Sequence, residues 1–153
     1  MLNNGDTLPD FNLPIQGGAY LSSEALKGKR LLLYFYPKDS TPGCTIQATD
    51  FTVNKAAFEA LNTGVVGVSK DSVKSHDKFC DKYDLSIDLI SDPDALLIDA
   101  CGAWKQKSMY GRTFMGIERS TFLFDEHSVL IKAWPKVKAK GHAEELLTYI
   151  KSL

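Results

Sequence analysis

The stretch that decides the fold is Tyr34-Phe35-Tyr36-Pro37-Lys38-Asp39-Ser40-Thr41-Pro42-Gly43-Cys44-Thr45, in which an apolar run ends in a turn and leads to a cysteine. The apolar run from Leu31 to Tyr36 is short, rich in aromatic residues and followed by Pro37. Such a run is typical of a strand that is buried on both faces. We therefore predict a central strand, followed by a polar loop that ends at Cys44.

A helix is predicted to begin directly after this loop. Thr41 fits the N-cap and Pro42 the first helical position, where the missing N–H of proline costs nothing. Apolar residues then recur at three- and four-residue steps, which is typical of an amphipathic helix. These residues are Ile46, Val53, Ala57, Phe58 and Leu61. Counted from Thr41, Cys44 lies in the first turn.

The position of Cys44 predicts a reactive thiol. Amide groups in the first turn of a helix have no intrahelical acceptor, and the helix dipole places positive potential there, so a thiolate is favoured over a thiol. Cysteines in such positions can have pKa values lowered from about 8.5 to roughly 3.5–7.5. The alternative is a small, inert core residue, since free cysteines are often buried. The strand, loop and helix start around Cys44 favour the reactive thiol.

The rest of the chain predicts one α/β domain over residues 1–153. The Gly17-Gly18 pair predicts an N-terminal hairpin. Further strands are expected at 64–69, 89–91, 120–124 and 129–134, and further helices at 72–83, 95–101 and 144–153. Residues 105–118 have weak periodicity and two glycines, so we expect a loop or an irregular strand there. The order of these elements is that of thioredoxin, with a mixed central sheet flanked by helices.

Several motifs resemble those of one enzyme family. The pattern Pro37-x-x-x-Thr41-x-x-Cys44 resembles the active-site signature of the peroxiredoxins. Together with Tyr36, Lys38 and Asp39, it is similar to the subgroup called bacterioferritin comigratory protein, or Q-type peroxiredoxin. Three further motifs stand in the family's order: Asn12-Leu13-Pro14, Gly67-Val68-Ser69-Lys70-Asp71-Ser72 and Arg119-Ser120-Thr121-Phe122-Leu123. The resemblance covers nearly the whole chain and implies a thioredoxin-like fold.

The resemblance implies a thiol peroxidase that uses no metal, haem or flavin. The Cys44 thiolate would attack the O–O bond of hydrogen peroxide or an organic hydroperoxide and become a sulfenic acid. Thr41, the Cys44 backbone N–H and Arg119 would donate hydrogen bonds in the site, and Pro37 would shield the sulfur from water. Without the resemblance, Thr41 could be only a helix cap and Arg119 only a solvated arginine at a strand start.

Cys80 occupies the place where some Q-type peroxiredoxins carry a resolving cysteine. Others carry it five residues after the reactive cysteine, but that position is Thr49 here. The resemblance therefore implies a Cys44–Cys80 disulfide, recycled by thioredoxin or a similar dithiol. Because a disulfide needs Cα atoms within about 7 Å, we expect local unfolding if the two cysteines start farther apart. The alternative is that Cys80 only packs a helix face and an external thiol resolves the sulfenic acid.

Gln47 departs from the family pattern. Many relatives carry glutamate three residues after the reactive cysteine. An amide keeps the hydrogen bonding but removes a charge, so the resemblance implies a weaker or differently oriented network around Arg119.

The remaining cysteine and the histidines suggest no second site. Cys101 matches no catalytic position of the family, so we expect it to be structural. His76 and Cys80 are spaced as two metal ligands could be, but a tetrahedral site needs more partners. His127 and His142 have no ligand-like spacing. We expect all three histidines to be exposed or half-buried.

Composition argues against several other classes of partner. With 18 basic and 19 acidic residues the net charge is −1, so nucleic acid is not expected to bind. No apolar run approaches the roughly 18 residues of a membrane span, and the N-terminus lacks the features of a signal peptide. Three cysteines without zinc-like pairing suit a reducing compartment, so we expect a cytoplasmic monomer that contacts no membrane.

A function from another class also remains open. A thioredoxin fold can serve as a non-catalytic binding module, because the fold alone does not fix the function. A disulfide reductase of the thioredoxin type is disfavoured because the chain has no C-x-x-C pair.

Overall fold

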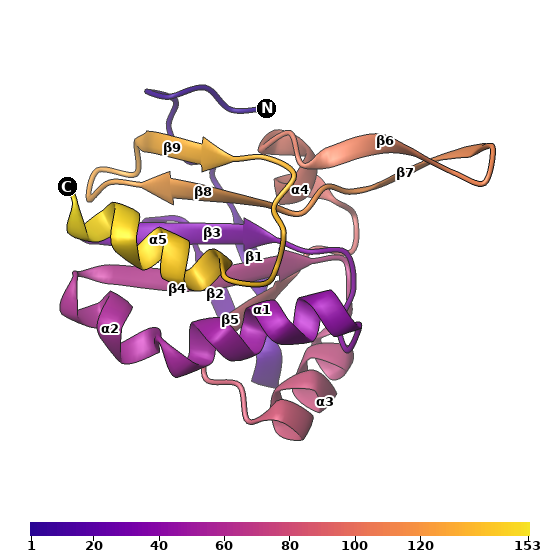
Figure 1. Cartoon of the computed structure of the whole chain (residues 1–153), viewed down its shortest axis with the longest axis horizontal. Helices are drawn as coiled ribbons and strands as arrows, with labels where there is room; N and C mark the ends of the chain where they lie inside the picture. Colours follow the sequence, from indigo (N-terminus) through magenta and orange to yellow (C-terminus); the bar gives the residue numbers. More distant parts are fainter.

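The computed structural model describes all 153 residues, which form a mixed five-stranded sheet with helices on both faces (Figure 1). The strand order is β5-β4-β3-β8-β9. Strands β3, β4 and β5 are parallel, while β8 runs antiparallel to β3, and β9 runs antiparallel to β8. The bounds are β3 Arg30–Phe35, β4 Thr63–Ser69, β5 Asp88–Ser91, β8 Ser120–Phe124 and β9 Leu130–Trp134. This is the predicted thioredoxin-like arrangement, and the strand predictions are confirmed to within one residue at each end.

Two hydrophobic cores lie on the two faces of the sheet, and β3 contributes to both. Leu31, Leu33 and Phe35 belong to one core, and Leu32 and Tyr34 to the other. This alternation confirms the prediction of a strand buried on both faces. The second core also receives side chains from α1 (Pro42–Val53), α2 (Lys55–Ala60), α3 (Val73–Tyr83) and α5 (His142–Lys151).

The other face of the sheet is covered by α4 (Leu96–Ala100) and by the N-terminal segment. That segment contains the predicted hairpin, formed by β1 (Asn12–Pro14) and β2 (Tyr20–Ser22). The turn between them is a short 3-10 segment, Gln16–Gly18, in which both glycines have positive φ. A second 3-10 segment, Glu24–Leu26, precedes β3. No helix of the fold combines the length and the apolar character needed to cross a bilayer.

The prediction of one amphipathic helix after Thr41, with Ile46 and Val53 on its buried face, is wrong in two respects. The helix is interrupted at Asn54, whose backbone N–H and side-chain amide both donate to the carbonyl of Asp50. Such local bonding by asparagine competes with helix continuation. In addition, Ile46 and Val53 are exposed, because the buried face of α1 is the one that carries Cys44, Gln47, Ala48 and Phe51.

Residues 105–118 are not a loop but mostly a regular hairpin, β6 (Trp104–Met109) with β7 (Arg112–Ile117). Its two-residue turn, Tyr110-Gly111, has φ values of 53° and 76°. These are the left-handed values that a tight hairpin turn requires. The two strands pair only with each other, and the hairpin extends beyond the body of the molecule (Figure 1). Because most of its side chains are not buried, its apolar periodicity is weak.

Candidate active site

Cys44 lies in the first turn of α1, as predicted, and only 2% of its surface is exposed. Thr41 has the extended backbone of an N-cap residue and Pro42 is the first helical residue. The first hydrogen bond of the helix runs from the N–H of Thr45 to the carbonyl of Thr41. The N–H of Cys44 precedes that bond and has no acceptor within the protein. It is therefore free to donate to a molecule held beside the sulfur.

Arg119 contacts the sulfur directly. Its Nη2 lies 3.3 Å from Sγ of Cys44, and its Nη1 donates to Oε1 of Gln47 at 2.7 Å. The guanidinium crosses Gly43, where a Cβ atom would lie 3.2 Å from Nη2, so glycine leaves room for this approach. The structure thus places a permanent cation at the thiol, with one donor directed at the sulfur and a second held by Gln47. A hydrogen bond from a charged donor is shorter and stronger than one between neutral groups, so this contact holds the sulfur and the guanidinium together.

Gln47 keeps Arg119 in place without adding a charge. It is buried one turn after Cys44 on the same face of α1. One arm of Arg119 reaches Gln47 and the other reaches Cys44, while the expected difference from relatives with glutamate stays a prediction. The Nε2 group of Gln47 is buried without a hydrogen-bond partner. A glutamate here would instead place a negative charge against the guanidinium.

Thr41 and Pro37 flank the site. The Thr41 hydroxyl does not cap the helix, because it donates to the carbonyl of Lys38 at 2.8 Å. Its proton is therefore already engaged, and its lone pairs are left to accept a hydrogen bond. Pro37 is exposed at the end of β3, so its expected role in shielding the sulfur stays a prediction.

A buried polar network fastens the loop before Cys44 to helix α3. The Asp39 carboxylate accepts hydrogen bonds from the hydroxyls of Tyr36 (2.7 Å) and Ser75 (2.8 Å), and its Oδ2 lies 2.7 Å from Nδ1 of His76. Nε2 of His76 lies 3.0 Å from the carbonyl oxygen of Ile90. A carbonyl can only accept, so Nε2 carries a hydrogen, and one further hydrogen lies between His76 and Asp39.

The expectation that all three histidines are exposed or half-buried is therefore wrong for His76, which is fully buried. It is also wrong for His142, which is buried at the start of α5 between Thr121 and Glu145. Burial lowers the pKa of His142, against the opposing effect of Glu145. Only His127 is exposed. The partners of the His76 ring, and Thr121 beside the His142 ring, are distant in sequence. The sequence alone does not show that such residues meet.

Cys80 is a half-buried free thiol on α3. Burial raises its pKa to about 11, and the carboxylates of Asp39, Asp77, Asp81 and Asp88 add to the rise. Cys80 is therefore protonated at neutral pH. Cys44 and Cys80 pack in the same core but are not bonded to each other.

Tyr34 packs in the same core as Cys44 and was not singled out from the sequence. Its hydroxyl is buried without a hydrogen-bond partner and lies against Gly67, where a Cβ atom would be 2.8 Å from it. Burial raises the pKa of Tyr34 well above its usual value, and the negative charge of Cys44 raises it further. A tyrosine in a central strand is expected to be an ordinary core residue, so no feature of the sequence singles out Tyr34.

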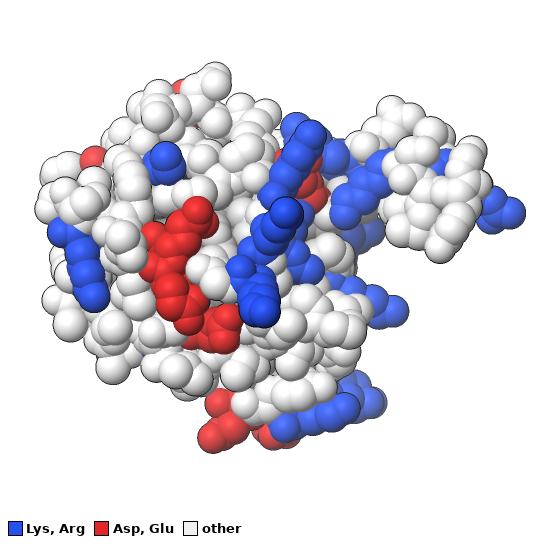
Figure 2. Space-filling view, viewed as in Figure 1, with Lys and Arg blue, Asp and Glu red and all other residues white.

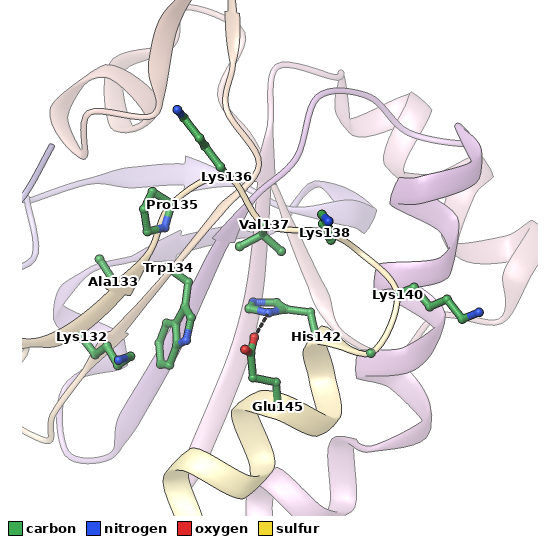
Figure 3. A pocket seen from close by; sticks show the side chains of 11 residues that line it. Lys132, Ala133, Trp134, Pro135, Lys136, Val137, Lys138, Lys140, His142 and Glu145 are labelled. Atoms are coloured by element: carbon green, nitrogen blue, oxygen red, sulfur yellow. Dashed lines mark hydrogen bonds and ion pairs between the residues drawn. The ribbon is translucent and has the colours of Figure 1, made fainter.

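Two pockets open near this end of the sheet. One of about 510 Å³ is lined by Arg119, by the β6–β7 hairpin and by Lys136 and Val137. The other, of about 470 Å³, lies between β9 and α5 and also includes Lys136 and Val137 (Figure 3). Neither pocket is lined by a cysteine, but Arg119 lines the first and not the second, whose His142 is held by Glu145. Only the first pocket therefore leads to the guanidinium that contacts Cys44.

The third cysteine, Cys101, is fully buried at the end of α4. Burial raises its pKa to about 12. It lies in the core on the opposite face of the sheet from Cys44. No group of three or more His, Cys, Asp or Glu side chains is arranged to hold a metal ion.

Proteins of known family are similar to this chain along most of its length. Residues 4–133 match the AhpC/TSA family. A putative peroxiredoxin bcp of Coxiella burnetii is 45% identical over 143 residues, covering 94% of this chain and 95% of the relative. Peroxiredoxin Bcp of Bacillus subtilis is 44% identical over 149 residues, covering 97% and 95%.

Solved structures agree. The bacterioferritin comigratory protein of Xanthomonas campestris, described as having alkyl peroxide reduction activity, is 43% identical with a TM-score of 0.89, over 93% of this chain and 90% of the other. A cysteine-to-serine mutant of Xylella fastidiosa PrxQ is 42% identical with a TM-score of 0.94, over 99% and 97%. With a cysteine at the start of α1 under an arginine, and with these matches along nearly its whole length, the chain belongs to the AhpC/TSA family and is a peroxiredoxin similar to the Bcp proteins.

Proposed function

We propose that this peroxiredoxin reduces hydroperoxides through Cys44. The thiolate attacks the terminal oxygen of the peroxide, the O–O bond breaks, and Cys44 becomes a sulfenic acid. The second oxygen leaves as water or an alcohol after it takes up a proton. The observation that carries the proposal is the 3.3 Å contact between Arg119 Nη2 and Cys44 Sγ at a helix start whose Cys44 N–H is free.

Three groups are assigned to the transfer of charge. Arg119 and the Cys44 N–H donate to the peroxide oxygens as negative charge develops on them. The Thr41 hydroxyl, whose proton goes to Lys38, accepts a hydrogen bond from the peroxide O–H and so orients it. The alkyl peroxide activity described for the Xanthomonas relative supports organic hydroperoxides as substrates beside hydrogen peroxide.

Cys80 is assigned the resolving step. Its thiol condenses with the sulfenic acid of Cys44, releasing water and leaving a Cys44–Cys80 disulfide. A dithiol such as thioredoxin then reduces that disulfide to two thiols and becomes a disulfide itself. Because Cys80 is protonated within an intact α3, we propose that this helix opens locally before the bond forms.

The test compares the parent protein with Cys44→Ser and Cys80→Ser. We expect Cys44→Ser to lose peroxide consumption altogether. Cys80→Ser should consume one equivalent of peroxide at the parent rate and show no internal disulfide by mass spectrometry. Its thioredoxin-driven turnover should fall at least about tenfold, because the sulfenic acid of Cys44 accumulates. Full turnover by Cys80→Ser would instead assign resolution to an external thiol. A parent thiol at Cys44 that survives stoichiometric peroxide would contradict the enzymatic proposal.

A further inference from the structure

The β6–β7 hairpin carries exposed apolar side chains that the peroxide chemistry does not use. They are Met109, Tyr110, Phe114 and Met115. The hairpin projects from the body, and the uncharged surface of its outer part is flanked by basic side chains (Figures 1 and 2). Apolar side chains gathered on one exposed element mark interaction sites.

Tyr110 in particular is not explained by the stability of the hairpin. It is 97% exposed and occupies the first turn position with φ 53°. Asparagine, aspartate or glycine fits that left-handed position best. An aromatic side chain gains no burial there within the protein. Contact with another molecule would bury it.

The charges of the hairpin favour an acidic partner. Residues 104–117 contain Lys105, Lys107 and Arg112 and no aspartate or glutamate. Residues directly opposite in an antiparallel pair share a face, and Lys107 pairs with Phe114 while Met109 pairs with Arg112. One face therefore carries all three cations together with two of the apolar side chains.

That same face leads to the active site. Lys105, Lys107, Met109 and Phe114 line the 510 Å³ pocket together with Arg119. Burial lowers the pKa of Lys107, and the charge of Arg119 lowers it further. A protein that attacks the Cys44 sulfur of the disulfide has to bring its own sulfur close to Arg119. A hydroperoxide within the pocket would leave Tyr110 and Met115 uncovered, since neither lines it.

We propose that this hairpin is the docking surface for the protein dithiol that reduces the oxidised enzyme. The partner presents its reactive thiol within an apolar patch that is rimmed by acidic residues. The inference rests on the proposed function. In the step served by docking, a partner thiolate attacks one sulfur of the Cys44–Cys80 disulfide, and the second partner thiol then displaces the enzyme, leaving two thiols here and a disulfide on the partner.

The test uses two variants at the tip, Tyr110→Asn and Arg112→Glu, which lie outside the pocket. Tyr110→Asn keeps the turn, because asparagine suits its backbone. We expect each variant to lower kcat/KM for thioredoxin by about tenfold, as the loss of an anchor residue of an interface does. The rate is measured as NADPH consumption in the presence of thioredoxin reductase. Peroxide consumption driven by dithiothreitol should stay at the parent rate. For the parent, kcat/KM for thioredoxin should fall with rising ionic strength.

Val53→Ser and Lys151→Glu are matched controls on α1 and α5, and both should leave the two assays unchanged. The docking surface is overturned if the tip variants keep full thioredoxin-driven turnover, or if they slow the dithiothreitol-driven reaction equally. It is also overturned if the tip variants change the sedimentation of the reduced protein or its binding to anionic vesicles, because the hairpin would then bind a second copy or a membrane. The same holds if glutathione supports peroxide turnover by the parent and thioredoxin does not. A parent that consumes no peroxide even with dithiothreitol contradicts the proposed function itself.

Discussion

Gln47 shows how a single neutral side chain can set the charge at the reactive sulfur. Its amide oxygen holds one arm of Arg119, and the other arm is directed at Cys44. Because an amide carries no charge, the full positive charge of the guanidinium acts on the sulfur. The unpartnered Nε2 group of Gln47 is the price of this arrangement, since a buried donor without an acceptor costs about 1–3 kcal/mol.

A glutamate at this position is expected to make Cys44 less reactive. In Gln47→Glu a second negative charge lies close to Cys44 and offsets Arg119, so alkylation of Cys44 by iodoacetamide at neutral pH should slow by about tenfold. Gln47→Met, which removes the hydrogen bond without adding a charge, is the matched control and should slow alkylation less. A Gln47→Glu protein that is alkylated as fast as the parent would show that the charge of Arg119 does not govern the reactivity of Cys44.

At the scale of elements, the Asp39 network joins the two segments that carry Cys44 and Cys80. Asp39 belongs to the loop before α1, whereas Ser75 and His76 belong to α3. These bonds hold α3 in its helical form one turn before Cys80. Any opening of α3 that brings Cys80 to Cys44 must therefore strain or break them.

Ser75→Ala should loosen this fastening. It removes one donor to the Asp39 carboxylate, so we expect a loss of about 1 kcal/mol in unfolding free energy. Amide hydrogen exchange in α3 should accelerate, and the Cys44–Cys80 disulfide should form faster after one equivalent of peroxide. Thr148→Ala on α5 removes a comparable helix hydroxyl and should change neither rate. Unchanged exchange in α3 would separate the network from helix opening.

For the molecule as a whole, the sequence predicts those features that depend on local patterns. The strands of the central sheet and helices α3, α4 and α5 follow from apolar runs and turn residues, and Cys44 is located by the proline and glycine around it. What the sequence does not predict depends on contacts between distant segments. Asp39 and His76 read as ordinary polar residues until folding brings them together.

The predictions for the buried face of α1 and for the β6–β7 hairpin are wrong for related reasons. Ile46 and Val53 are large and apolar but exposed, and the side chains of α1 that face the core are Cys44, Gln47, Ala48 and Phe51. The hairpin strands are paired but mostly exposed, so burial imposes no alternation on their sequence. Size and hydrophobicity of single residues mislead wherever an element is not organised by one continuous core.

The stability of the whole fold should fall at alkaline pH. Burial raises the pKa of Cys101 to about 12 from an ordinary value of 9.0. The folded state therefore retains a proton that the unfolded chain loses. The contribution of Cys101 to the free energy of unfolding is fully present below about pH 9. It is lost as the pH rises toward 12, by at most about 1.4 kcal/mol per pH unit.

Urea unfolding under reducing conditions between pH 7 and 10 tests this expectation. Cys101→Ala should be less stable than the parent near pH 7 by about 1 kcal/mol, because it leaves a small void in the core. Its stability should decline less steeply above pH 9. Tyr34 and Tyr36, whose pKa values are also raised by burial, add a loss of the same sign at higher pH in both proteins. Parallel profiles for the two proteins would exclude Cys101 as the cause.

The carboxylates around Cys80 also affect how the reduced enzyme reacts when no substrate is present. Four aspartates and partial burial keep that sulfur unreactive for as long as α3 is intact. Under the proposed mechanism, stray oxidants and electrophiles meet one responsive sulfur per molecule instead of two. The second reacts only when α3 opens, so the resting protein is protected from unproductive cross-linking.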